Sequence, residues 1–494
     1  MTFPRAAGIL LHPTSLPGPG GIGTLGENAY QFLDTLHAAS MTIWQILPLS
    51  PTGYGDSPYS ALSAFAGNPF LIALEPLIDA GWLGPEDLGP LLSLPESQVD
   101  FGRLVPAKMA VLRRAFERFR ADHAPQDAVS SFAQENAAWL EDFALFMAIK
   151  DAHGGVQWDR WEEGLRKYQP DALERAREQL RTEIEFHRFV QFVFFQQWRS
   201  LKARAGELGI KIVGDIPIFV AHDSVDVWAH QDLFQLDQEG FPLVVAGVPP
   251  DYFSATGQLW GNPHYRWDVM AQTGYAWWVE RFRMLLRMVD IVRLDHFRGF
   301  AAAWTVPYGN DTAEHGAWVP APGEALFTAV RDALGTLPII AEDLGVITDD
   351  VVALRRAFSL PGMQVLHFAF SGDIYSTALP HNFERNTVVY TGTHDNDTTV
   401  GWWMSASDDM RREVLAYLGT TGSDISWDLM RLAFASVADL AIVPLQDVLR
   451  AGSHSRMNTP GRPEGNWSWR FVPGMLDDAR VSGLRNLARV YGRV

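Results

Sequence analysis

Short apolar runs recur along the chain, and segments with helical spacing separate the later ones. The runs are rich in Val, Ile and Leu with little polar alternation, which is typical of strands buried on both faces of a parallel sheet. Thr348 is expected to cap a helix through about residue 358, and Ser407 one through about 418 that ends at Gly419. The pattern predicts strands at 43–49, 70–74, 211–216, 290–294, 338–341, 364–370, 387–391 and 441–445.

Strands that alternate with helices indicate βαβ units. Eight strands favour an α/β fold of the (β/α)8 (TIM) barrel type, with helical insertions between strands, and an open doubly wound sheet is the alternative. Residues 1–494 are therefore expected to form a single barrel. An inserted, mainly helical subdomain is expected at 76–207, where Trp139, Phe143 and Phe146 share one helix face and are expected to pack in its core. Residues 246–265 are rich in Gly and Pro and are expected to form a long active-site loop.

Charge and composition exclude several classes of protein. The chain has 58 Asp and Glu against 40 Lys and Arg, a formal net charge of −18, which argues against nucleic acid and anionic membranes as partners. Cys is absent, so disulfides, Cys-ligated metals and a thiol nucleophile are excluded, and a reducing, cytoplasmic location is expected. Several of the 18 Trp, 29 Phe and 12 Tyr fall in Gly/Pro-rich segments, where they could stack on sugar rings or cover a large core.

A glycine motif near the start raises the possibility of a dinucleotide site. Gly18, Gly20 and Gly23 have the spacing of a G-x-G-x-x-G fingerprint. Pro17 and Pro19 stiffen this turn, however, and no acidic residue follows the next predicted strand to bind a ribose. We therefore expect no nucleotide cofactor.

Ionisable residues lie at or just after the carboxyl ends of four of the predicted strands. They are Asp215; Arg293, Asp295 and His296; Glu342 and Asp343; and His394, Asp395 and Asp397. In a barrel the carboxyl ends of all strands surround one pocket, so these side chains are expected to converge. The set suits either a metal-dependent hydrolase or a glycosidase with a carboxylate pair. Arg293 would place a fixed cation beside a metal but would keep a carboxylate nucleophile ionised, which favours the glycosidase.

Blocks spread over nearly the whole chain resemble the amylomaltases, or 4-α-glucanotransferases, of the α-amylase clan. The blocks include Gly55-Asp56-Ser57-Pro58-Tyr59, Gly214-Asp215-Ile216-Pro217, Gln258-Leu259-Trp260-Gly261-Asn262-Pro263, Arg293-Leu294-Asp295-His296-Phe297, Ala341-Glu342-Asp343-Leu344-Gly345, Gly392-Thr393-His394-Asp395 and Pro460-Gly461-Arg462-Pro463-Glu464-Gly465-Asn466-Trp467.

The resemblance implies a retaining double displacement on α-1,4-glucans and maltooligosaccharides, with glucose as an acceptor and without a metal or cofactor. The family nucleophile matches Asp295, its acid/base matches Glu342, and the carboxylate that holds the distorted sugar matches Asp395. Substrate-binding residues are expected at Tyr54, Ser57, Tyr59, Asp215, Asp251, Phe253, Gln258, Trp260, Arg293, His296, His394 and Asn466.

The chain departs from the wider clan at two places, where Phe219-Val220 and Gly299 occupy positions that often hold Asn-His and His. The departure puts hydrolytic amylase activity in doubt. A hydrolytic amylase, a metal-dependent hydrolase on the same barrel and a non-catalytic carbohydrate-binding protein are the alternatives.

Overall fold

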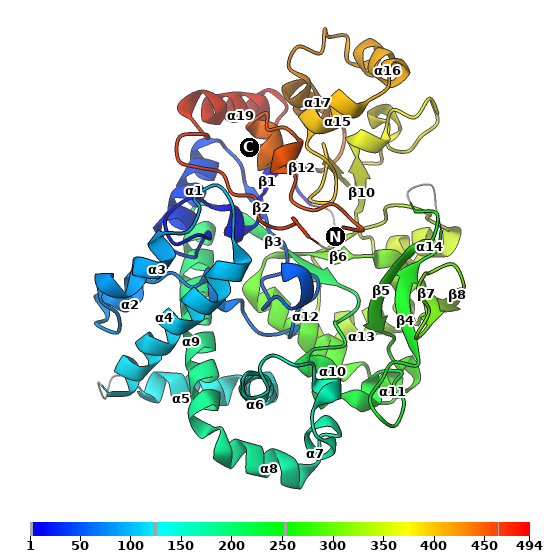
Figure 1. Cartoon of the computed structure of the whole chain (residues 1–494). Helices are drawn as coiled ribbons and strands as arrows, with labels where there is room; N and C mark the ends of the chain where they lie inside the picture. Colours follow the sequence, from blue (N-terminus) through cyan, green and yellow to red (C-terminus); the bar gives the residue numbers. More distant parts are fainter. Residues whose placement is uncertain (1–2, 122–125, 251–253, 463) are drawn as a thin grey trace.

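Eight parallel strands form the centre of the computed structural model, which describes residues 3–121, 126–250, 254–462 and 464–494 (Figure 1). The strands follow the order β10-β11-β12-β1-β2-β3-β6-β9. Ala341 N–H donates to Pro361 O at 2.9 Å, so the end of β9 meets the start of β10 and the sheet closes on itself. This architecture confirms the predicted (β/α)8 barrel. Its strands are β1 (Ala6–Leu10), β2 (Ile43–Gln45), β3 (Lys211–Pro217), β6 (Ile291–Asp295), β9 (Ile339–Ala341), β10 (Gly362–Val365), β11 (Thr387–Tyr390) and β12 (Leu440–Pro444).

One predicted strand is wrong and one strand was missed. Residues 70–74 begin in a 3-10 turn, Pro69–Leu71, because Asn68 Oδ1 accepts a hydrogen bond from Phe70 N–H at 2.9 Å and Pro69 has no N–H to donate to a ladder. The eighth strand is instead β1, which pairs with β12 on one side and β2 on the other. The prediction for 364–370 extends too far, since β10 ends at Val365.

Helices fill the chain between β2 and β3. The long helix α9 (Arg181–Glu207) docks on the barrel through Gln191 and Gln197, whose side-chain amides each bond both backbone groups of one residue, Gly67 and Ala73. Phe143 and Phe146 are buried as expected, and Trp139 packs on Phe195 at their edge. The other helices of this segment are α2 (Glu75–Asp79), α3 (Gly89–Leu92), α4 (Phe101–Ala121), α5 (Gln126–Glu135), α6 (Ala137–Ala152), α7 (Glu163–Arg166) and α8 (Pro170–Gln179).

The remaining helices cover the barrel, and two of them test the predicted caps. Ser407 Oγ accepts from Met410 N–H at 3.2 Å and Gly419 adopts a left-handed φ of 66°, which confirms both ends of the helix at 408–418. Thr348 precedes its helix as predicted, but its hydroxyl donates to Asp350 rather than capping a backbone N–H. These helices are α1 (Glu27–Ala38), α10 (Val225–Ala229), α11 (Trp267–Gln272), α12 (Ala276–Met288), α13 (Gly323–Leu334), α14 (Asp349–Ala357), α15 (Thr399–Ser405), α16 (Asp408–Leu418), α17 (Ile425–Ala435), α18 (Leu445–Val448) and α19 (Asp478–Val490).

A second, antiparallel sheet of four strands stands beside the barrel, in the order β5-β4-β7-β8 (Figure 1, green strands at the right). Its strands are β4 (Val244–Val248), β5 (Gln258–Pro263), β7 (Ala302–Pro307) and β8 (Ala317–Pro320). The expectation of a loop at 246–265 is therefore wrong for residues 246–248, which belong to β4, and for residues 258–263, which form β5. The sheet joins the connection that precedes β6 to the one that follows it, since β4 pairs with β7.

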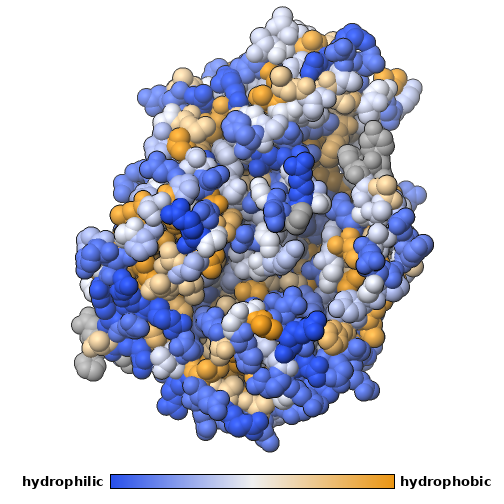
Figure 2. Space-filling model, viewed as in Figure 1, coloured by the Kyte–Doolittle hydropathy of each residue, from blue (hydrophilic) through white to orange (hydrophobic). Residues whose placement is uncertain are grey.

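The face of the molecule in Figure 2 is mainly hydrophilic, with apolar residues in separate groups between hydrophilic ones. Over the described residues, no helix combines the length and apolar character needed to cross a membrane.

Candidate active site

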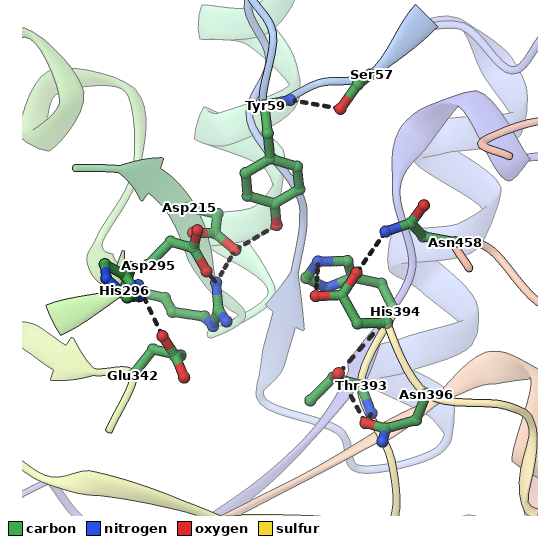
Figure 3. Close-up of polar contacts among 12 residues, drawn as sticks. Ser57, Tyr59, Asp215, Asp295, His296, Glu342, Thr393, His394, Asn396 and Asn458 are labelled. Atoms are coloured by element: carbon green, nitrogen blue, oxygen red, sulfur yellow. Dashed lines mark hydrogen bonds and ion pairs between the residues drawn. The ribbon is translucent and has the colours of Figure 1, made fainter. Parts of the chain in front are cut away.

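An arginine joins two carboxylates at the carboxyl ends of β3 and β6. Asp215 lies opposite Arg293 in the parallel register, so the two side chains leave the sheet on the same side. Arg293 Nη1 lies 2.6 Å from Asp215 Oδ2 and 2.9 Å from Asp295 Oδ1 (Figure 3). Arg293 and Asp215 are buried, whereas the Asp295 side chain is 28% exposed. The guanidinium therefore lies between a buried and a partly exposed carboxylate and pairs with both.

Glu342 follows β9, the neighbour of β6, and its carboxyl group is held by two backbone amides. Leu294 pairs with Ala341, so the next residues, Asp295 and Glu342, are side by side on adjacent strands. His296 has a left-handed backbone, with φ of 52°, and its N–H donates to Glu342 Oε2 at 2.7 Å. Leu344 N–H donates to Oε1 at 3.0 Å. These bonds fix the direction of the carboxyl group.

The two neighbouring carboxyl groups differ in environment. Burial raises the pKa of Glu342 to about 8, the negative charge of Asp295 adds to this rise, and Arg293 and the two amides partly oppose it. Glu342 is therefore mainly protonated at neutral pH and can donate a proton, while Asp295 is paired with a cation. A carboxyl group with a raised pKa beside a carboxylate that is paired with a cation is a usual arrangement of an acid and a nucleophile in one site.

Asp395 stands on the opposite side of the pocket, after β11. Asn458 Nδ2 donates to its Oδ1 at 2.6 Å, and Arg456 Nη2 donates to its backbone carbonyl at 2.6 Å. His394 Nε2 lies 3.4 Å from Asp395 Oδ2. The carboxylate is thus oriented by the segment 456–458 and by its own neighbour in sequence.

Tyr59 lies between Asp215 on one side of the site and His394 on the other (Figure 3). Its hydroxyl donates to Asp215 Oδ2 at 2.9 Å, and its ring stacks on His394 with centroids 5.3 Å apart and planes 13° apart. Ser57 Oγ accepts from Tyr59 N–H at 3.2 Å, so Ser57 shapes the turn that carries the ring. The Tyr59 ring therefore connects Asp215 to His394, the neighbour of Asp395.

The other predicted binding residues are less closely gathered. Trp260, on β5, is 38% exposed, and its ring meets the His296 ring edge-on with the centroids 4.8 Å apart. The Trp260 indole N–H donates to Gln258 Oε1. Tyr54 is 82% exposed and lies at the surface. Asn466 bonds Thr459 and Arg462 and so shapes its own turn. The predicted residues Asp251 and Phe253 lie outside the described residues.

Sequence reasoning missed three residues that build the pocket. Asn458 and Arg456 hold Asp395, and nothing in their local sequence pointed to that contact. Trp467 packs on both Tyr59 and His394, with centroids 5.9 and 6.0 Å away. Its φ of 63° is rare for a bulky residue, and such backbone strain is concentrated at functional sites. The aromatic end of the 460–467 block was the signal that could have identified it.

No group of three or more His, Cys, Asp or Glu side chains within the described ranges is arranged to hold a metal ion. The Arg293 guanidinium occupies the space between Asp215 and Asp295 where a shared cation would sit. Gly299 leaves little room for a side chain, because a Cβ there would lie 2.8 Å from Ile218 Cδ1 and 3.1 Å from His296 Cδ2. The chain thus has glycine where the wider clan often has His, and a larger side chain there would be crowded by its neighbours.

A closed (β/α)8 barrel that carries an arginine-paired carboxylate beside a second, buried carboxyl group at the ends of adjacent strands has the arrangement that retaining enzymes of glycosidic bonds use. The model of the family described as 4-alpha-glucanotransferase matches residues 11–475. A 4-alpha-glucanotransferase of Thermus thermophilus is 51% identical over 504 residues, covering 100% of both chains, and one of Synechocystis is 51% identical over 99% of this chain and 98% of its own. The amylomaltase of Streptococcus agalactiae, solved in complex with acarbose, superposes with a TM-score of 0.97 at 38% identity and 99% coverage of each chain. The chain belongs to the 4-alpha-glucanotransferase family, which confirms the resemblance seen in its sequence.

Proposed function

We propose that this enzyme transfers α-1,4-glucan segments from a donor to glucose or a maltooligosaccharide, with Asp295 as nucleophile and Glu342 as acid and base. The observation that carries the assignment is the side-by-side register of these residues at the ends of β6 and β9. Adjacent parallel strands lie about 4.8 Å apart, which suits the separation of about 5–5.5 Å between the carboxyl groups of retaining enzymes.

In the first half of the proposed reaction, an Asp295 oxygen attacks the anomeric carbon of the donor and the glycosidic C–O bond breaks. The Glu342 proton moves to the departing sugar oxygen. In the second half, Glu342 takes the proton of the acceptor hydroxyl, whose oxygen attacks the same carbon and releases Asp295. The two inversions leave an α-linkage, and no co-reactant is consumed.

Asp395 is proposed to bind the hydroxyl groups of the donor sugar and to hold that ring in its distorted form. Two observations support this role: the carboxylate is 44% exposed, and Asn458 fixes its orientation. Tyr59 and His394 would then flank the reacting sugar, with Arg293 behind the nucleophile.

The decisive experiment is incubation with maltotriose. Disproportionation should give glucose and a ladder of longer maltooligosaccharides, and the number of reducing ends should stay nearly constant because each broken bond is remade. A steady rise in reducing ends that matches product formation would identify a hydrolase and overturn the proposal.

The raised pKa of Glu342 predicts a basic limb in the pH profile. Its free carboxyl group must be protonated for the first step, and that form is lost as pH rises through about 8. We expect kcat/KM for maltotriose to fall about tenfold per pH unit above that value. With α-glucosyl fluoride, whose leaving group needs little protonation, this limb should be absent; the same limb with both donors would assign it to another group.

Trp260 is predicted to hold the acceptor. Removal of its exposed ring by Trp260→Ala should cost about 0.5–1.5 kcal/mol of stacking, and so raise the ratio of hydrolysis to transfer roughly two- to tenfold. Formation of the intermediate from glucosyl fluoride should slow less than transfer does. Leu259→Ala is the matched control, because Leu259 is similarly exposed and strand alternation directs it to the other face of β5. An unchanged ratio in Trp260→Ala would make Trp260 a packing residue.

A further inference from the structure

A small, partly open cavity lies between His394 and the segments that follow β1 and β12. Its volume is about 30 Å³, which is enough for one or two water molecules. The walls come from residues at or just after the ends of the four adjacent strands β11, β12, β1 and β2, and from the segment that holds Asp395. They include Leu11, His12, Thr393, His394, Gln446 and Arg456.

Two histidines lining this cavity each have a buried nitrogen with an unmet hydrogen bond. Neither His12 Nδ1 nor His394 Nδ1 has a partner among the described residues. Both residues are more than nine-tenths buried. A buried polar atom without a partner loses the hydrogen bond that water would give it, so two of them around one cavity of this size point to an occupant that bonds both. Water fits, because it can donate to one ring and accept from the other.

The charge state of His12 agrees with such a bridge. Burial, with a smaller contribution from the nearby His394, lowers its pKa to about 3, so the His12 ring is neutral. A neutral imidazole has one donor nitrogen and one acceptor nitrogen. His394 directs Nε2 toward the Asp395 carboxylate at 3.4 Å, which favours the proton on Nε2 and leaves Nδ1 as an acceptor.

We propose that an internal water joins His12 Nδ1 to His394 Nδ1, and that His12 is a positioning residue that fixes the tautomer and orientation of the His394 ring through this water. The kinetic part of the inference rests on the proposed function of the site. His12 itself touches no reacting atom: its effect passes through the water to His394, which stacks on Tyr59 and neighbours Asp395.

Three substitutions of His12 separate positioning from packing. His12→Phe keeps the ring shape but cannot bond the water, and should lower kcat for maltotriose about 10- to 100-fold, with KM changed less than about threefold, since misplacement of a catalytic group by about 1 Å has costs of this order. His12→Asn places an amide near the position of Nδ1 and should restore kcat to within about threefold of wild type. His12→Gln places its amide near Nε2 instead and should not. His187→Phe is the control, because His187 is equally buried but lies in α9 and bonds Asp151.

A measurement on the rings themselves decides the inference without the reaction. In protein with ¹⁵N-labelled histidine, His394 should show a proton on Nε2 and an acceptor Nδ1 in the wild type and in His12→Asn, and a mixture of tautomers in His12→Phe. A crystal structure should place an ordered water between the two Nδ1 atoms. An empty cavity, unchanged His394 resonances in His12→Phe, or equal losses in Asn and Phe variants would each overturn the inference. Because the resonances are read without substrate, they decide it even if the wild type fails to disproportionate maltotriose.

Discussion

Asp295→Asn is expected to lower transfer between maltooligosaccharides by about 10⁴-fold or more, since loss of a nucleophile removes the covalent route altogether. The amide is nearly isosteric, but it gives up the charge that pairs with Arg293 at 2.9 Å. The second carboxylate on that guanidinium, Asp215, keeps Arg293 in place at 2.6 Å. The fold should therefore survive, as circular dichroism and the thermal midpoint would show.

Asp290→Asn is the control for Asp295→Asn. Asp290 immediately precedes the same strand, at the opposite end of the barrel, where its carboxylate accepts from Ile212 N–H at 2.9 Å. Side chains at that end contribute to stability rather than to chemistry. This variant should unfold at lower temperature but turn over maltotriose at close to the wild-type rate. Comparable loss of activity in both variants would show that turnover depends on the negative charge near β6 in general and not on a nucleophile at Asp295.

Glu342→Gln is expected to lower turnover of maltotriose by about 10²–10⁴-fold, the usual contribution of a positioned acid, yet to leave attack on α-glucosyl fluoride largely intact. Deglycosylation then lacks its base, so a glycosyl-enzyme should accumulate on Asp295. Intact-protein mass spectrometry followed by peptide mapping would detect it. An adduct on another residue, or none, would reject the assignment of both residues.

The structure adds a condition to the Glu342→Gln experiment. Both oxygens of the Glu342 carboxyl group accept backbone N–H groups, from His296 and Leu344. Glutamine has only one acceptor oxygen, so one amide loses its partner at a cost of about 1–3 kcal/mol. The thermal midpoint should fall accordingly. Glu384→Gln at the surface is the matched substitution, and it should change neither stability nor turnover substantially.

The barrel and its charged pocket could be predicted because both follow from local patterns. Asp215, Arg293, Asp295 and Glu342 each lie at the carboxyl end of an apolar run, and parallel topology alone brings such ends together. The misplaced strand at 70–74 marks the limit of that reasoning. Its apolar run is buried like a strand, but the side-chain cap from Asn68 and the proline after it give a turn.

The parts that could not be predicted depend on contacts between distant segments. Asn458 reaches Asp395 across 63 positions of sequence, and Trp467 joins Tyr59 across a still longer span. The antiparallel sheet escaped prediction for a related reason. Its outer strand β8 is exposed throughout, so its residues have no buried face and no alternating pattern to reveal it.

The pairing of β4 with β7 constrains how enzymes of this kind can diverge in length. Val245 faces Val306 and Gly247 faces Trp304, so a residue inserted within either strand would shift every later pair and turn its side chains to the opposite face. Length changes are compatible with this sheet only where the chain leaves it, for example in the turn at 308–316 between β7 and β8. Insertions and deletions among related enzymes should therefore gather outside the paired strands, for example at that turn, while the lengths of β4 and β7 stay constant. For a protein engineer, the turn is a place to change the length of the chain without moving the nucleophile.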